Sequence, residues 1–371
     1  MSGAPVESPW SSLTASLNYT PPPLGERASP CDGCFSACCW VVQLLQSVPL
    51  TFTEFDFLRF CAGFERIEVG VNPAGTWVVN YRAPCRHLKA DFKCELHGSP
   101  EKPLVCQRYD ENHCMYRHAF LGPASQQYLR MDLGRLDRFL SLVTFDAVGR
   151  VHTIPEREAL LAALADVPPP APRPKAAAIP GRRLAGGARW DRERLRPTAQ
   201  LPTPEERPLT FAETAASPCV RCAAPCCQVL VFDHQTPESV NAVDFMEYML
   251  GFPGLELALT DAGWKTVVHS TCQHFDLERL ACGIWTDPSR PAICGSYDAH
   301  KCAYRNWLME PQQTRFVRLD HAAFQRVRRH FAYGPDGEVL VTMSVAQLEA
   351  ILVVVAPPSP LPPAGLDEAL L

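Results

Sequence analysis

The sequence has no long hydrophobic run. Its longest candidate, Ile351 to Ala356, ends at Pro357, whereas a helix that crosses a bilayer needs about 18 to 20 apolar residues. Residues 1–19 also lack the basic start and the continuous apolar core of a secretory signal. We therefore expect a cytoplasmic protein without a membrane partner.

The chain also lacks a strong excess of charge and a nucleotide-binding loop. The formal net charge is −5 and the pI is about 6.1, so no global field attracts the protein to nucleic acid or to an anionic membrane. No glycine-rich loop follows a predicted strand, as a loop for a nucleotide or methyl donor would, because Gly186-Gly187 lies in a proline-rich stretch. The sequence thus leaves enzymatic activity undecided and favours its absence.

Cysteine is what the sequence has in abundance, with 17 in 371 residues. In a reducing compartment, clustered cysteines bind metal or carry out redox chemistry more often than they form disulfides. A thiol-redox or disulfide-stabilised protein stays open as an alternative.

The cysteines belong to an internal repeat. The pattern Cys31-x-x-Cys34-x-x-x-Cys38-Cys39 returns 188 residues later as Cys219-x-x-Cys222-x-x-x-Cys226-Cys227. The same offset relates further pairs, among them Asp56 and Asp244, Gly63 and Gly251, Cys94 and Cys282, Cys106 and Cys294, Cys114 and Cys302, and Arg130 and Arg318. Only the pair Cys85 and Cys272 is off, by one residue. A repeat of this length predicts two homologous modules.

The expected organisation has five parts. A disordered tail (1–30) precedes the first cysteine-rich module (31–164), and a Pro/Arg-rich linker (165–208) leads to the second module (209–355) and a Pro-rich tail (356–371). The stretch 167–208 holds ten prolines and few large apolar residues, so it cannot bury enough surface to offset its ordering entropy. Its arginines around Trp190 would suit an acidic protein partner or nucleic acid, but a solvated linker is the preferred interpretation.

The residue pattern inside each module predicts an α+β fold. Apolar spacing, β-branched runs and capping aspartates predict helices and strands in the same order twice. The expected elements are helices 53–64 and 243–252, strands 77–81 and 265–268, helices 132–143 and 320–331 capped by Asp132 and Asp320, short strands 149–152 and 337–341, and last helices 156–164 and 345–354.

Sixteen of the cysteines are matched between the modules and are the candidate metal ligands. They are Cys31, Cys34, Cys38, Cys39, Cys85, Cys94, Cys106, Cys114, Cys219, Cys222, Cys226, Cys227, Cys272, Cys282, Cys294 and Cys302. A Cys-x-x-Cys turn brings two thiolates to one ion, and tetrahedral zinc takes four ligands. The unmatched Cys61 lies opposite Met249 and is interpreted as a core residue.

The number of ions is left open. Eight thiols per module fit two four-cysteine sites, an iron–sulfur cluster plus a zinc, or one site with thiols to spare. His87 and His274, each in a Cys-x-His sequence, are substitutes if one cysteine is not used. A structural or solvent-exposed role fits these histidines equally well.

The cysteine order resembles the YkgJ-like zinc- or iron-chelating domain family, with its Cys-x-x-Cys-x-x-Cys-Cys sequence and later Arg-Pro-x-x-Cys segment. Module two matches the second part as Arg290-Pro291-Ala292-Ile293-Cys294, and module one has Lys102-Pro103-Leu104-Val105-Cys106. Both modules carry one extra residue before the cysteine doublet, which is more similar to the cysteine-rich region of flagellin lysine-N-methylases. That second resemblance implies an iron–sulfur cluster.

These observations favour a protein that binds zinc or iron and has a structural, storage or sensing role, with metal ions as its first partners. A protein partner that docks on a metal-shaped surface fits the same pattern. By resemblance, the alternative is an iron–sulfur-dependent protein-modifying enzyme such as a lysine N-methyltransferase.

Overall fold

The computed structural model describes residues 10, 36–72, 74–109, 116, 128–170, 224–276, 281–297, 304 and 316–353. Contacts divide the chain into two compact units. Unit 1 comprises Met1–Ala83, Asp110–Pro174 and Ser270–Asp298, and unit 2 comprises Pro84–Tyr109, Lys175–His269 and Ala299–Leu371. Both units combine helices with antiparallel sheet, which confirms the predicted α+β class.

Unit 1 is built on a four-stranded antiparallel sheet with the order β1-β3-β2-β4. The strands are β1 (Val41–Ser47), β2 (Ile67–Val71), β3 (Trp77–Arg82) and β4 (Leu129–Met131). Successive side chains of a strand point to opposite faces, so Ile67, Val69 and Val71 share one face of β2 while Glu68 lies on the other. Every residue of β2 and β3 is buried, which means that both faces of the sheet centre are covered.

Among the helices of unit 1 are α1 (Phe52–Ala62), α4 (Leu133–Leu140) and α5 (Arg157–Ala163), and a small hairpin joins β5 (Thr144–Phe145) to β6 (Val151–Thr153). Thr51 and Glu54 form a capping box at the start of α1, and Asp132 caps α4 as predicted. Phe55 of α1 packs edge-on against Trp77 of the sheet at 5.0 Å between ring centroids. The sheet and α1 therefore share an aromatic core.

Trp10 also belongs to that core. Its side chain is completely buried, its indole nitrogen donates a hydrogen bond to the Pro49 carbonyl oxygen at 2.9 Å, and its ring meets Phe55 edge-on at 5.2 Å. Residues 1–30 were expected to form a disordered tail, so a core residue among them was not predicted. A tryptophan buries a large apolar area, so this one residue ties the start of the chain to unit 1.

Unit 2 repeats the arrangement. Its sheet has the order β7-β9-β8-β12, from β7 (Val229–Asp233), β9 (Gly263–His269), β8 (Leu255–Thr260) and β12 (Phe316–Leu319). The helices α7 (Val240–Leu250), α9 (His321–Arg328) and α10 (Val345–Val353) follow, with Asp320 as the predicted cap of α9. Val243 and Met246 of α7 pack with Phe324 and Val327 of α9 in the core.

The hairpins explain why one cysteine pair is off by a residue. In unit 1, Gly70 pairs with Val78, and in unit 2, Ala258 pairs with Lys265. The connection between the two strands is thus one residue shorter in the β8–β9 hairpin than in the β2–β3 hairpin. The one-residue slip between Cys85 and Cys272 begins at this turn.

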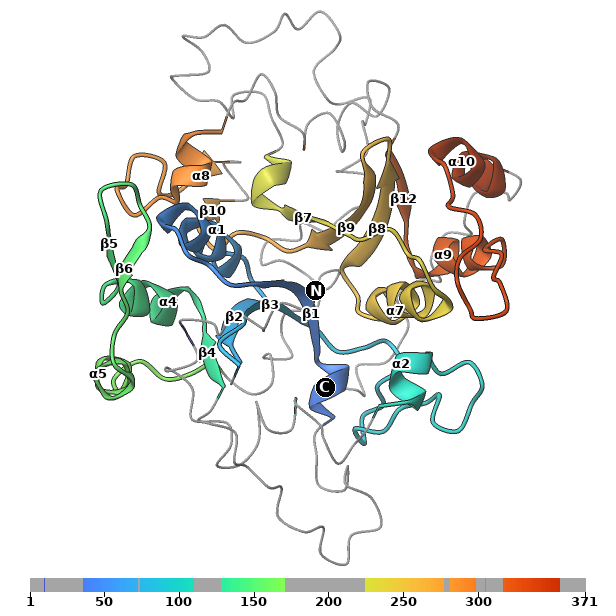
Figure 1. The fold of residues 1–371 in the computed structure, drawn as a ribbon, viewed down its shortest axis with the longest axis horizontal. Coiled ribbons are helices and arrows are strands. Elements are labelled where there is room, and N and C mark those ends of the chain that lie inside the picture. Colours follow the sequence, from blue (N-terminus) through green and yellow to red (C-terminus); the bar gives the residue numbers. More distant parts are fainter. Residues whose placement is uncertain are drawn as a thin grey trace, which may run out of the picture. The chain divides into compact units, whose positions relative to one another are not determined.

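The cysteine-rich segments are exchanged between the units. Pro84–Tyr109 follows β3 in the sequence but belongs to unit 2, and Ser270–Asp298 follows β9 but belongs to unit 1. In Figure 1, α2 (Leu104–Gln107) accordingly lies against α7, and α8 (Ala292–Gly295) lies beside α1. The boundaries of the sequence repeat therefore differ from those of the compact units, because each unit contains segments from both halves of the chain.

Most predicted elements have counterparts within two or three residues, including α1, α7, β3, β9 and the two last helices. The short strand expected at 337–341 is reduced to two isolated bridges, Ser239 with Glu338 and Tyr333 with Val339. Residues 171–208 of the predicted linker and the tail 356–371 lie outside the described part of the chain. Within the described part, no helix is long and apolar enough to cross a membrane.

Candidate functional site

The cysteine doublets lie on two matching 3-10 turns, η2 (Ala37–Cys39) and η6 (Pro225–Cys227). The residue before each turn, Ser36 or Ala224, has a left-handed backbone with φ of 57° and 50°. This conformation is unfavourable for residues with a Cβ. It is present in both halves, in the stretch where each carries one residue more than the Cys-x-x-Cys-x-x-Cys-Cys sequence.

The next two cysteines of half 1 (residues 1–164) lie on a tight turn and a small hairpin. The Leu88 amide donates to the Cys85 carbonyl at 3.0 Å, Leu88 forms a bridge with Cys94, and the Glu95 amide donates to the His87 carbonyl at 2.8 Å. The hairpin therefore sets the backbone of Cys85 and Cys94 with respect to one another.

Half 2 (residues 209–371) forms the same hairpin from different side chains. The Phe275 amide donates to the Cys272 carbonyl at 3.0 Å, and Phe275 pairs with Cys282, where β10 (Phe275–Asp276) meets β11 (Ala281–Cys282). The Gly283 amide donates to the His274 carbonyl at 2.7 Å. The backbone pattern is thus kept although the loop sequences differ.

Cys106 and Cys294 occupy the third position of the four-residue helices α2 and α8. The amide of each donates to the carbonyl of the proline three residues before it, at 2.9 Å for Cys106 and 3.0 Å for Cys294. Pro103 and Pro291 stand at the N-cap of these helices. The proline of the Arg-Pro-x-x-Cys segment therefore starts the turn that carries the thiol.

The arginine of that segment holds the loop around Cys294. The guanidinium of Arg290 lies 3.6 Å from the centroid of the Trp285 ring, a cation–π contact. It also donates to the carbonyl oxygens of Trp285, at 3.1 Å, and of Cys294. In half 1, Lys102 stands at this position, and Gln107 bridges to the carbonyls of Lys102 and Pro100 instead.

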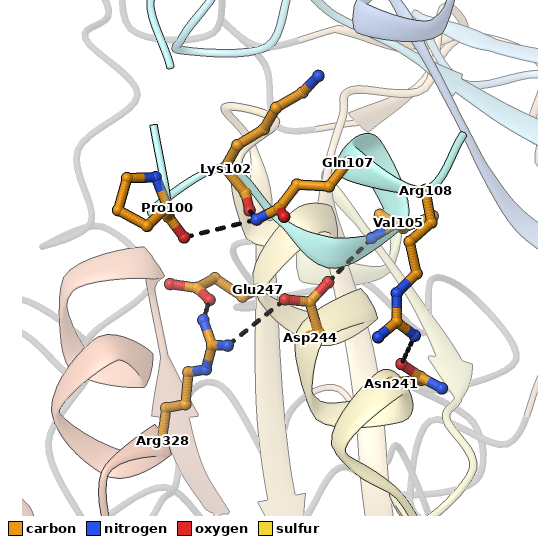
Figure 2. Close-up of polar contacts among 9 residues, drawn as sticks. All are labelled: Pro100, Lys102, Val105, Gln107, Arg108, Asn241, Asp244, Glu247 and Arg328. Atoms are coloured by element: carbon orange, nitrogen blue, oxygen red, sulfur yellow. Dashed lines mark hydrogen bonds and ion pairs between the residues drawn. The ribbon is translucent and has the colours of Figure 1, made fainter. Parts of the chain in front are cut away.

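Two buried aspartates connect these short helices to the units on which they dock. Asp56 of α1 accepts hydrogen bonds from the amides of Ala292 and Ile293, both at 3.0 Å. Asp244 of α7 accepts one from the amide of Val105 at 3.2 Å, and its other oxygen lies 3.4 Å from the Arg328 guanidinium (Figure 2). The matched aspartates thus make the same kind of contact in both units.

His87 and His274 differ in their surroundings. The Nδ1 atom of His87 lies 2.5 Å from a carboxylate oxygen of Glu95, the kind of contact that orients a metal-binding imidazole through its second nitrogen. The residue that matches Glu95 is Gly283, so His274 has no such carboxylate at that position. Among the described residues, this carboxylate contact is present at His87 and has no counterpart at position 283.

The unmatched cysteine is set apart by its burial. Cys61 is completely buried in α1, its counterpart Met249 is also buried, and burial raises the pKa of the Cys61 thiol. A protonated thiol is a poor ligand because metals bind the thiolate. The ten described matched cysteines are all partly exposed.

Six predicted ligands, Cys31, Cys34, Cys114, Cys219, Cys222 and Cys302, lie outside the described residues. Among the residues that are described, no three His, Cys, Asp or Glu side chains lie close enough together to hold an ion. The thiolate chemistry of the matched cysteines fits zinc or iron, but which thiols share an ion stays a prediction.

Each unit contains buried charged residues that were not predicted from the sequence to interact. Glu68 of β2 receives Arg82 of β3 at 2.8 Å and Arg130 of β4 at 2.7 Å, with all three side chains at most 6% exposed. In unit 2, Glu256 pairs with Arg318 at 2.6 Å and lies 3.4 Å from His269. Glu68 and Glu256 are also related by the repeat offset, so a charged residue inside a repeated apolar strand was the available signal.

No family model, no curated protein and no solved structure matches this chain. The resemblance to YkgJ-like domains and to the flagellin lysine-N-methylases accordingly stays a prediction from the cysteine order. The functional argument depends on the residues of the chain itself.

Proposed function

We propose that this protein binds zinc or iron through the matched cysteines of a duplicated, cysteine-rich module. Metal binding would stabilise the cysteine-rich segments, and the protein would have a structural, storage or sensing role in a reducing compartment. The metal would be held by thiolates of the two cysteine doublets and of the segments that follow β3 and β9. Zinc would supply tetrahedral cross-linking, and iron would supply a cluster with redox properties.

The contrast between matched and unmatched cysteines carries the proposal. A cysteine without a chemical task is among the most buried residue types, and Cys61 behaves in this way. The matched cysteines that the structure describes are instead partly exposed. They occupy turns, hairpins and short helices whose backbone hydrogen bonds recur in both halves. Repeated placement of accessible thiols favours ligands over packing.

Several structural parallels support the duplication. The two sheets share their strand order, Thr51 and Ser239 cap α1 and α7, and Asp132 and Asp320 cap α4 and α9. A duplicated module with one site in each half is the simplest account of sixteen matched thiols. The Pro-rich linker would then join two copies of one sequence.

Cysteine variants with a matched control test the proposal. Cys106→Ser and Cys294→Ser should each lower the metal content, because they remove one thiolate from one half. Cys61→Ser should leave the metal content unchanged. Equal losses from all three variants, or none from Cys106→Ser and Cys294→Ser, would contradict the assignment.

The absorption spectrum of the same anaerobic samples separates the metals and the alternative functions. A broad visible charge-transfer band indicates an iron–sulfur cluster. That result would leave the protein-modifying enzyme open as the alternative function. A colourless protein with bound metal indicates zinc. Few titratable thiols after denaturation with a chelator would favour the disulfide-stabilised alternative.

A further inference from the structure

The first helix of each half carries a buried aspartate that metal binding does not require. The exposed fraction is 6% for Asp56 of α1 and 2% for Asp244 of α7. Burying a carboxylate is costly unless it is hydrogen-bonded. Core packing therefore does not explain an aspartate at this position, and its hydrogen bonds should.

Both carboxylates bind the first turn of a short helix. Asp56 takes the amides of Ala292 and Ile293, the first two residues of α8, and Asp244 takes the amide of Val105, the second residue of α2. First-turn amides have no acceptor within their own helix. A carboxylate at this end also interacts favourably with the helix dipole.

The short helices depend on these contacts. Each has four residues, whereas an isolated helix needs about 12 to 15 residues to be even marginally stable. Neither Pro103 nor Pro291 at the N-cap offers a side-chain acceptor. The aspartate supplies the missing cap, and the helix that it caps carries Cys106 or Cys294.

A second contact anchors the start of each cysteine-rich segment to the end of the same long helix. The Arg86 amide donates to the Gly251 carbonyl at 2.8 Å, and the Gln273 amide donates to the Gly63 carbonyl at 2.9 Å. Gly251 is required here, because a Cβ would lie 2.9 Å from the Tyr248 carbonyl and 3.4 Å from the Cys85 sulfur. Each segment is thus held at two points along a helix of the other half.

We propose that the two aspartates are positioning residues that act across the repeat. Asp244 of half 2 positions Cys106 of half 1, and Asp56 of half 1 positions Cys294 of half 2. Neither half then arranges its own thiols alone. This inference rests on the proposed function in one respect: the positions of the thiols affect metal binding only if the thiols are ligands.

Site-resolved thiol labelling of the full-length protein tests the crosswise assignment. Anaerobically purified protein is alkylated, and the rates at Cys106 and Cys294 are followed by mass spectrometry of the two peptides. Asp244→Ala should raise the rate at Cys106 about tenfold, since a lost cap contact of about 1.4 kcal/mol corresponds to a factor of ten. The rate at Cys294 should stay within about twofold, and Asp56→Ala should give the reverse pattern.

Asp320→Ala is the matched structural control. It weakens the cap of α9 in unit 2, where Asp320 accepts from the Ala323 amide at 2.8 Å, without touching α2. The labelling rate at Cys106 should therefore hardly change. An aspartate variant that exposes the cysteine of its own half, both cysteines equally, or neither cysteine would overturn the proposal.

A change on the loop side covers the case in which an aspartate variant fails to fold. Ala292→Pro removes one amide donor to Asp56 at the first position of α8, where proline is well tolerated, and leaves α1 unchanged. It should raise labelling at Cys294 only, and unchanged labelling there would refute the positioning role. The metal content of the wild type is measured separately, so absence of metal would refute the proposed function without deciding the labelling pattern.

Discussion

The buried charge cluster of unit 1 allows a quantitative test of how the sheet is held together. Glu68 receives Arg82 through one hydrogen bond of 2.8 Å and Arg130 through two, of 2.7 and 3.0 Å. Burial lowers the pKa of Arg82, and the Glu68 carboxylate opposes that change. Without Glu68, two guanidinium groups would face one another away from water.

Glu68→Gln keeps the shape of the side chain and removes its charge. Breaking a buried ion pair by removing one partner costs about 3 to 5 kcal/mol, and we expect a loss of stability in that range for unit 1. Glu256→Gln should cost about half as much, because Arg318 is 21% exposed and its charge is partly solvated.

Amide hydrogen exchange measures the two units separately, because it reports the local free energy of opening at β2 and at β8. Glu65→Gln, at an exposed position just before β2, is the control and should change stability by less than about 0.5 kcal/mol. A loss of less than about 1 kcal/mol for Glu68→Gln, or equal losses for both glutamates, would refute the reasoning.

Three further predictions follow from contacts within single units. Trp10→Ala should destabilise unit 1 by about 3 to 5 kcal/mol, measured by hydrogen exchange, because it empties a fully buried site; a loss of less than about 1 kcal/mol would contradict the burial. Burial, together with the charges of Arg86 and His87, lowers the pKa of His321 to about 4, so the unfolded chain takes up a proton at higher pH than the folded one and stability should fall as the pH drops from about 6.5 towards 4. His321→Leu, which copies Leu133 of unit 1, should flatten that pH dependence of the urea midpoint, and an unchanged slope would contradict it. Cleavage at a protease site inserted between residues 180 and 190 should leave both halves together in gel filtration, because each unit contains segments of both, and separation without denaturant would refute the exchange.

Local signals were sufficient to predict the helices other than the four-residue α2 and α8. Asp132 and Asp320 accept hydrogen bonds from the third residue of α4 and α9, as N-caps do, and the apolar spacing located α1 and α7 to within a few residues. The strands β7, β8 and β12 and their counterparts β1, β2 and β4 were not predicted. The last has only three residues, and strands this short have too little alternation to be recognised.

The exchange of the cysteine-rich segments could not have been predicted from the repeat. Asp56 and Asp244 are matched, as are Gly63 and Gly251, so the first helix of either half offers the same docking groups to either segment. Contacts within a half and contacts across the halves therefore look identical in sequence. Which segment docks on which helix depends on how the chain connects them, and the residue types alone do not indicate this.

The candidate ligand cysteines were recognisable for a different reason. The repeat supplied an internal comparison that separated Cys61, with Met249 at the matching position, from sixteen shared thiols. The burial of Cys61 agrees with that separation. The proposed positioning role of Asp56 and Asp244 could not be predicted from the sequence, because a matched aspartate is compatible with many roles. It became apparent only from the hydrogen bonds that the amides of α8 and α2 donate to these carboxylates.

Elemental analysis of the metal-to-protein ratio is the most direct test of the central claim. Full-length protein would be purified under nitrogen with its thiols reduced, and zinc and iron would be measured against protein concentration. Thiolate ligation in both halves predicts at least one tightly bound ion for each half. A reduced protein that is compact and carries neither metal would contradict it.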